Sequence, residues 1–342
     1  MPTDPSVIDA RTSANTPLPF VDLQLAGASW MLDGSVHSQI FVPMPVATQV
    51  GALPIWVADR HLYTLDRDSA GNPARIPRKI DGTAYNCTEA ALEAPVADDA
   101  AKSYWDKSKA YVHAGQQVFL SHLIARDNTA ATLALNTAVI DNAAATAVYS
   151  TDSTDVIQEL VGIIEDRATL LGVDPSALNV FIPAKAWKAI KRNATVKAAL
   201  LTFFSGAGVN SLNMQPMQFA AMLGCGKVII GRLQKDTANP SKTQVLAPIW
   251  DKTKILIYLP STPQYEMIGF GKMVSWAGGL DPSDIAMATG AEVDPALLLR
   301  TDMYRDERAT SDIVRVRDYK QFLITNAKAA YIVTGVVGGG YT

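Results

Sequence analysis

The chain has 342 residues, 48% of them hydrophobic and 18% charged, and its formal net charge is -3. This balance is typical of a globular protein with a core that fills one large domain or two ordinary ones, and it excludes a disordered or fibrous chain. The small net charge gives no reason to expect a surface built for the phosphate backbone of nucleic acids.

The cysteines and the apolar runs indicate whether the protein is disulfide-bonded, zinc-binding, exported or membrane-spanning. Cys87 and Cys225 lie far apart and outside any CxxC pair, so we expect neither a disulfide framework nor a zinc site. The N-terminus lacks the basic and apolar regions of a signal peptide, and no later run approaches the roughly 18 apolar residues of a membrane span. We therefore expect a soluble protein in a reducing interior, with no cofactor and no membrane partner.

The N-terminal part of the chain is predicted to be an extended arm over residues 1–49. Its first 35 residues are rich in Pro, Ser, Thr, Asp and Gly, and alone they bury too little to offset their conformational entropy. The following stretch, HSQIFVPMPVATQVGALPIW, contains Pro43, Pro45 and Pro54. Each proline fixes φ and removes a backbone donor, so this stretch should be extended without forming a regular central strand.

A long β-hairpin is predicted over residues 50–96. The strand-like runs ALPIWVADRHLYTL and GTAYNCTEAALEAPV flank a polar middle that contains Gly71-Asn72-Pro73, which is turn chemistry. Cations in this middle are interspersed with acids, which suits contact with another charged surface. These cations are Arg67, Arg75, Arg78 and Lys79.

One helix of about thirty residues is predicted over about 97–128. Its aromatic and apolar side chains recur at spacings of three, four and seven, and it is longer than the usual globular helix. Asp98 and Asp99 fall in its first turn, where the helix dipole favours acids.

Residues 150–290 read as a compact α/β unit, and a closing β segment follows at 312–337. A polar loop after the strand KVIIGRL carries Lys235 and Asp236. The helices are expected at 155–172, capped by Ser153 or Thr154, and at 184–201 and 216–226, and the strands at 178–183, 227–233, 243–250, 255–260 and 265–279.

Each candidate motif for catalysis or ligand binding lacks residues that its chemistry requires. GCGKV and GFGKM lack the upstream glycine and the hydroxyl of a phosphate loop. A calcium-loop-like start at 66–71 has Ala70 and Pro77 where oxygen ligands are required. His113 and His122 are nine residues apart, unlike a metal-binding i, i+4 pair, and there is no GxSxG elbow. We expect no enzyme and no catalytic, cofactor-binding or metal-binding residues.

The order of these parts resembles the major capsid proteins of tailed bacteriophages, which have the Hong-Kong-97-type fold. Three stretches carry the resemblance over essentially the whole chain. They are IFVPMPVATQVGALPIW, similar to the segment before the extended loop; NCTEAALEAPVADDA, similar to the return strand that leads into the spine helix; and KVIIGRLQKDTANPSKTQVLAPIWDKTKILIYLP, similar to the axial strands and their polar loop.

The resemblance implies an α+β fold with four parts. These are an N-terminal arm (1–49), an extended hairpin loop (50–96), a peripheral domain (97–149 and 291–342) with the spine helix at about 97–128, and an α/β axial domain (150–290). Covalent crosslinking is not implied, because the lysine and asparagine that some members join are not identified in this sequence.

The resemblance also implies a head protein that self-assembles into hexamers and pentamers of an icosahedral shell around double-stranded DNA. Implied partners are portal, scaffolding and decoration proteins and DNA bound without sequence specificity; the implied location is the virion capsid, assembled in the host cytoplasm. The alternatives are an encapsulin-like nanocompartment shell, an α/β enzyme with an unrecognised site and a carbohydrate-binding module. The residues expected at assembly interfaces are Arg67, Arg75, Arg78, Lys79, Asp98, Asp99, Lys235 and Asp236.

Overall fold

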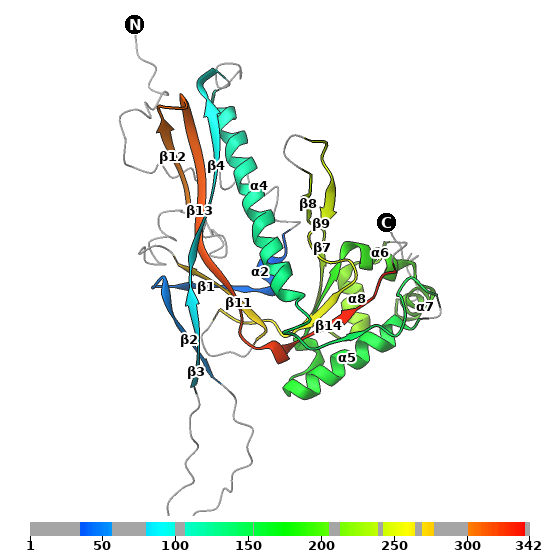
Figure 1. Cartoon of the computed structure of the whole chain (residues 1–342). Helices are drawn as coiled ribbons and strands as arrows, with labels where there is room; N and C mark the ends of the chain where they lie inside the picture. The colour runs from blue at the N-terminus through cyan, green and yellow to red at the C-terminus, as the bar shows by residue number, and fades with distance from the viewer. Residues whose placement is uncertain are drawn as a thin grey trace, which may run out of the picture.

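The computed structural model describes residues 35–56, 80–99, 107–152, 154–204, 213–238, 242–263, 269–276 and 300–338. These residues form two five-stranded sheets, two short ribbons and the helices that pack on them (Figure 1). Most of the expected arm and the tip of the expected hairpin lie outside the described residues.

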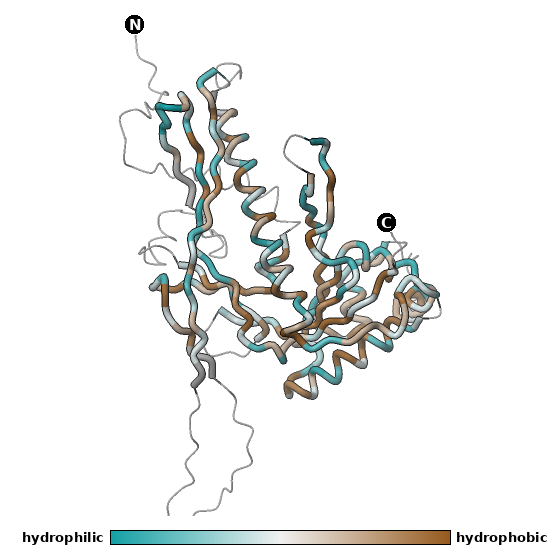
Figure 2. The backbone as a smooth tube through the Cα atoms, in the orientation of Figure 1, coloured by the Kyte–Doolittle hydropathy of each residue, from teal (hydrophilic) through white to brown (hydrophobic). Residues whose placement is uncertain are grey.

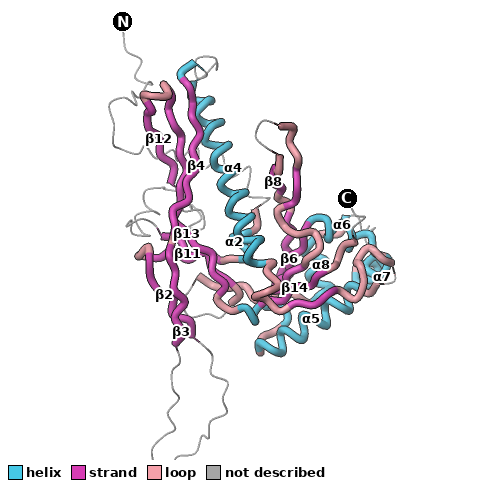
Figure 3. The backbone as a smooth tube through the Cα atoms, viewed as in Figure 1, coloured by secondary structure: helices cyan, strands magenta, loops and turns pink. Residues whose placement is uncertain are grey.

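Each sheet combines strands from both halves of the chain, and helices pack on the sheets (Figure 3). The helices are α2 (His37–Ile40), α4 (Lys107–Ala134), α5 (Val156–Leu171), α6 (Ala184–Arg192), α7 (Ala194–Phe203) and α8 (Pro216–Leu223), with 3-10 turns η1 (Pro175–Ala177) and η4 (Ala327–Ala329). The strands are β1 (Val42–Val46), β2 (Val50–Trp56), β3 (Ile80–Asn86), β4 (Thr88–Ala97), β5 (Asn142–Ala144), β6 (Asn179–Pro183), β7 (Lys227–Gly231), β8 (Gln234–Asp236), β9 (Leu246–Pro248), β10 (Ile255–Tyr258), β11 (Gly271–Trp276), β12 (Arg300–Asp306), β13 (Ser311–Ile324) and β14 (Ala330–Thr334).

The first sheet, here called the long sheet, is built around β13. Its order is β1-β11-β13-β12, and β4 pairs with β13 as well. Helix α4 lies along one face of this sheet (Figure 1). Because side chains alternate along a strand, Val314 and Val316 both turn toward α4, and Val316 packs with Val118, Phe119 and Leu123 of the helix.

The expected return strand of the hairpin divides at the fully buried Cys87. Before it, β3 pairs with β2 as predicted for a hairpin; after it, β4 leaves that ribbon and pairs with β13. A two-stranded ribbon is marginal in water, whereas β4 gains both a strand partner and the cover of α4. Strand β4 runs to Ala97, and Asp98 and Asp99 are helical, as expected for a helix that starts near residue 97. Helix α4 covers Lys107–Ala134 and so ends beyond the expected residue 128.

The proline-rich stretch forms an edge strand. Pro43 and Pro45 lie in β1, which pairs in parallel with β11 at the border of the long sheet. Two prolines spaced by two remove donors from one side of the strand only, so the other side keeps its donors for pairing. The expectation that this segment avoids a central strand position is confirmed.

The second sheet, here called the compact sheet, has the order β5-β14-β10-β6-β7. Strand β6 is buried on both faces, which explains its continuous apolar sequence. Val180 and Ile182 pack with residues of α5, α6, α7 and α8, whereas Phe181 belongs to the core on the opposite face, which contains the end of α4. The helices of residues 155–223 therefore all cover one face.

Two expected helical features differ in detail. Residues 184–201 form two helices because the buried Asn193 ends α6 and caps α7: its side chain accepts hydrogen bonds from the N–H groups of Thr195 and Val196. Helix α5 is capped by Asp155, which accepts from the N–H of Gln158, instead of by the expected neighbours.

The closing segment forms two strands in two different sheets. β13 ends at Ile324 in the long sheet, η4 turns the chain, and β14 lies between β5 and β10 in the compact sheet. Strand β11 also belongs to the long sheet, although residues 271–276 fall within the expected axial domain. The backbone therefore connects the two sheets directly through η4.

An aromatic cluster packs where the two sheets meet. The ring centroid of Phe41 lies 5.6 Å from that of Phe270 and 5.3 Å from that of Phe322, and Tyr258 lies 6.1 Å from Phe270. The Tyr258 hydroxyl donates to the carbonyl of Gln39 at 2.9 Å. Figure 2 shows hydrophobic residues concentrated in this central region and hydrophilic residues at the far ends of β12, β4 and the β8–β9 ribbon.

Within the described part of the chain, no helix has both the length and the apolar character needed to cross a bilayer.

Phe41→Ala should lower the free energy of unfolding by about 3–5 kcal/mol, because it empties a fully buried ring position between two other rings. Phe203→Ala is the matched control, since that ring is 64% exposed at the end of α7, and it should change stability by about 0.5 kcal/mol or less. Denaturant unfolding followed by tryptophan fluorescence measures both. Equal losses in the two variants would contradict the assignment of Phe41 to the shared core.

Candidate assembly surfaces

Four of the expected interface residues lie outside the described residues, and four lie within them. Arg67, Arg75, Arg78 and Lys79 belong to residues 57–79, so the contacts of the hairpin tip stay a prediction. Asp98, Asp99, Lys235 and Asp236 are described, and they do not gather in one place.

Asp98 forms a contact within the chain. Its two carboxylate oxygens accept hydrogen bonds from the guanidinium of Arg305 on β12, at 2.6 and 2.8 Å. Arg305 also reaches Asp312 at 3.3 Å. This forked pair ties the end of β4 to β12 across β13, and Asp99 lies exposed beside it. An interface role for the two acids stays a prediction.

Lys235 and Asp236 organise the β8–β9 ribbon. The Lys235 ammonium donates to the side-chain oxygen of Asn128 on α4 at 2.7 Å. Asp236 accepts from the N–H groups of Ala238 and Val245, each at 2.9 Å. The ribbon projects beside α4 (Figure 1), and these contacts hold β8 against α4 and join the described residues Ala238 and Val245 to Asp236.

Strands β4 and β13 carry a row of charge pairs that the sequence reasoning missed. Arg315 lies 3.9 Å from Glu93, and Arg317 lies 3.7 Å from Glu89. The Arg315 guanidinium also lies 5.3 Å from the centroid of the Tyr304 ring. These side chains are partly exposed on the face of the sheet that turns away from α4, where each pair contributes about 0–1 kcal/mol. The alternation in VRVRDYK was the signal for this row.

A buried ionic cluster joins α4 to β13. Asp318 on β13 accepts from Arg126 Nε at 2.9 Å and from Lys320 Nζ at 2.6 Å, and its other oxygen lies 3.0 Å from His122 Nε2. Arg126, His122 and Asp318 are each at most 2% exposed. His122 Nε2 also lies 3.3 Å from Lys320 Nζ, and the Asp318 oxygen beside it has no hydrogen-bond partner among the described residues.

The second part of the cluster connects α4 to the residues that follow the arm. Asp127, fully buried, accepts from the backbone N–H of His37 at 3.0 Å and from its Nδ1 at 2.7 Å. The Ser35 hydroxyl donates to the same carboxylate at 3.1 Å. His37 Nε2 is buried with no hydrogen-bond partner among the described residues. A protonated His37 would leave that N–H unsatisfied, so the geometry favours the neutral ring.

The electrostatics of the cluster follow from burial and pairing. Burial lowers the pKa of His37 and that of His122, although Asp127 and Asp318 oppose the change. Burial alone would raise the pKa of Asp318, but the hydrogen bond from His122 and the charges of Arg126 and Lys320 hold it below its ordinary value. Burial, with the charge of Arg126, lowers the pKa of Lys320 to about 8. Near neutral pH the positive charges of Arg126 and Lys320 therefore face the negative charge of Asp318.

The two cysteines and the possible metal ligands of the described residues can be assessed directly. Burial raises the pKa of the Cys87 thiol and that of Cys225 to about 11, so both stay protonated and are weak nucleophiles near neutral pH. No group of three or more His, Cys, Asp or Glu side chains within the described ranges is placed to hold a metal ion.

The fold is similar to that of solved phage and phage-related proteins. A phage-related protein from Bordetella bronchiseptica RB50 aligns with a TM-score of 0.67 and 17% identity, over 94% of this chain and 98% of that one. The capsid of cyanophage P-SCSP1u aligns with a TM-score of 0.56 and 10% identity, over 90% and 89% of the two chains. The mature capsid of bacteriophage PhiM1 aligns with a TM-score of 0.53 and 13% identity, over 86% and 84%. No family description and no curated sequence matches the chain. These alignments confirm the α+β fold class expected from the sequence.

Acid should destabilise the protein through the two buried histidines. A histidine whose folded pKa lies below its unfolded value of about 6.5 binds fewer protons folded than unfolded, so stability is full above pH 6.5 and falls as the pH drops toward the folded pKa. We expect His122→Gln to reduce the loss of unfolding free energy between pH 7 and 5 by up to about 1 kcal/mol per pH unit. Denaturant unfolding at each pH measures the slope, in a range below the titration of Lys320.

The matched control for this pH dependence is His113→Gln, which changes an exposed histidine on the same helix. It should keep the acid loss that His122→Gln removes. Identical slopes for the unchanged chain and the His122 variant would contradict the neutral, buried assignment.

Proposed function

Because the chain has the fold of the phage major capsid proteins, we propose that it is a capsid shell subunit that assembles with copies of itself. The observation that carries the proposal is the extent of the alignment with the cyanophage capsid, which covers 90% of this chain and 89% of that one and therefore extends beyond the compact sheet. A shared fold limited to the compact sheet would carry much less weight.

The features that project from the sheets suit assembly. The β2–β3 ribbon extends away from both sheets, and the β8–β9 ribbon extends on another side (Figure 1). A single exposed pair is weak, but a closed symmetric shell repeats each contact many times. Mixed charges, such as those along β4 and β13, set register without making one contact too tight.

The finer proposal is that copies form hexamers and pentamers of an icosahedral shell around double-stranded DNA, in a virion assembled in the host cytoplasm. In it, residues 1–49 act as an arm, 50–96 as an extended loop, 97–149 and 291–342 as a peripheral domain and 150–290 as an axial domain. Portal, scaffolding and decoration proteins would be the partners. Particles from the native host that hold nuclease-protected duplex DNA would support this proposal, whereas protein cargo without DNA would favour a nanocompartment shell.

The purified chain should form rings or shells, because the proposed contacts lie between identical copies. Static light scattering and negative-stain microscopy measure the mass and the shape of the particles. A monodisperse species of 36.7 kDa at high protein concentration would contradict the proposal.

Removing residues 1–30 should reduce assembly without unfolding the described part, because we propose that the arm contacts a neighbouring subunit. Light scattering follows assembly, and the thermal unfolding temperature serves as the folding control. Undiminished assembly by the shortened chain would show that the arm is not an assembly element.

A further inference from the structure

Helix α6 presents a stripe of positive charge on the compact sheet. Its nine residues, AKAWKAIKR, contain four cations and no acid. The inner side buries Trp187 and Ile190, while Lys185, Lys188 and Arg192 follow at i, i+3 and i+7 and so share the outer side. Lys188 and Arg192 are exposed and Lys185 is half-buried. We call these three residues the basic stripe.

Among the described residues the basic stripe has no ion-pair partner, in contrast to other cations. Arg305, Arg315 and Arg317 of the long sheet each lie near a carboxylate. No residue of the stripe has an ion pair within the described residues. Like charges at i, i+3 and i+4 repel by a few tenths of a kcal/mol per pair, so this arrangement is unfavourable for the isolated chain.

Helix α5 carries the opposite charge. It contains Glu159, Glu165 and Asp166 against one cation, Arg167, which is engaged with Asp141 at 2.8 Å and stacked 4.3 Å from the centroid of the Tyr331 ring. Glu165 and Asp166 are exposed and also lack ion-pair partners among the described residues. We call these two residues the acidic pair.

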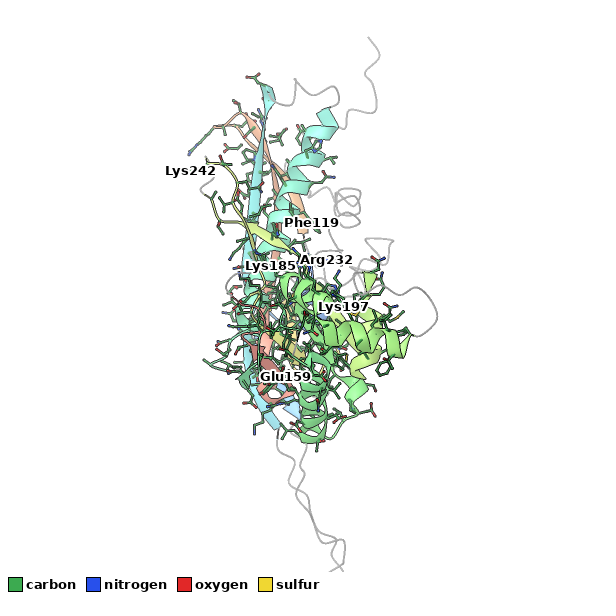
Figure 4. The ribbon with its side chains drawn as sticks, turned by 90° about the vertical axis from the view of Figure 1, so that its right-hand side faces the viewer. Phe119, Glu159, Lys185, Lys197, Arg232 and Lys242 are labelled. Carbon is green, nitrogen blue, oxygen red and sulfur yellow. The ribbon has the colours of Figure 1, made fainter. Side chains whose placement is uncertain are left out.

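The helices that carry the basic stripe and the acidic pair lie at different borders of the helical layer that covers one face of the compact sheet. Figure 1 places α5 along the lower border and α6 at the upper border. In the view from the side, Lys185, Lys197 and Arg232 lie above Glu159 (Figure 4). If two copies met through the same surface, charges of the same sign would face each other. In a head-to-tail contact, α6 of one copy would meet α5 of the next, and charges of opposite sign would face each other. Head-to-tail contacts are the kind that close into rings.

We propose that the basic stripe of α6 binds the acidic pair of α5 on a neighbouring copy of the chain. The proposal rests on the proposed shell function, because it assigns one contact within a ring of subunits. Its physical basis is charge complementarity between two exposed surfaces that have no ion pairs with the described residues of their own chain.

The test reverses charge on each side and then on both. Lys188→Glu with Arg192→Glu, and separately Glu165→Lys with Asp166→Lys, should each raise the concentration for half-maximal assembly about 10-fold or more at low salt. The chain that carries all four substitutions should recover most of the lost assembly, because the complementarity is restored with reversed sign. Light scattering measures the assembly of each full-length chain, and thermal unfolding confirms that each is folded.

A control separates position from net charge. Arg308→Glu with Lys328→Glu changes the net charge by the same amount at exposed residues outside both helices and should leave assembly near that of the unchanged chain. An equal loss in this control, or no recovery in the four-substitution chain, would overturn the contact.

Two further outcomes distinguish the proposals. An unchanged chain that stays monomeric contradicts both the shell function and the contact, whereas normal assembly by the Lys188 and Arg192 variant contradicts the contact alone. Normal assembly with weakened binding of linear double-stranded DNA in a gel-shift titration would also overturn the contact and assign the basic stripe to phosphate binding.

Discussion

Two buried carboxylates on the path between α4, β13 and the residues after the arm hold the long sheet in place. Asp318 accepts hydrogen bonds from Arg126 and Lys320 and lies 3.0 Å from His122 Nε2. Asp127 is hydrogen-bonded to His37 and Ser35. Removing one member of such a pair leaves an uncompensated buried charge, at a cost of about 3–5 kcal/mol. The helix therefore cannot slide along the sheet without breaking several charged contacts at once, and the first described residues are held at the same position.

Buried and exposed charges have different roles in this structure. The interior uses few, fully paired charges that define one register between helix and strand, while the exposed face of β4 and β13 uses pairs that are individually weak. An assembling subunit benefits from both, since a rigid body presents its outer contacts in fixed geometry and weak contacts allow errors to dissociate. The aromatic cluster around Phe41 extends this rigidity to the compact sheet.

The sequence predicted the α/β unit, the long helix and the edge position of the proline-rich strand, because each depends on local periodicity or on proline chemistry. It did not predict where β4 pairs, because the choice between β2 and β13 depends on a partner more than two hundred residues away.

The cap at Asn193 was missed because KRNATVK is compatible with one continuous helix. Asp318 was not singled out, although it follows Val314 and Val316 in steps of two and so belongs to the face that meets α4. Of the expected interface residues, Asp98, Lys235 and Asp236 make contacts within the chain, which no pattern of charges along the sequence can distinguish from contacts between chains.

The passage of the closing segment through both sheets has a mechanical consequence. Residues Ser311–Thr334 form β13, the turn at η4 and β14 in succession, so tension applied at the far end of the long sheet reaches the compact sheet through a continuous backbone. Along β13 the hydrogen bonds to β4 and β12 lie across the direction of pull, and they share the load instead of breaking one after another. A subunit built in this way would transmit force between its neighbours while its two sheets stay together.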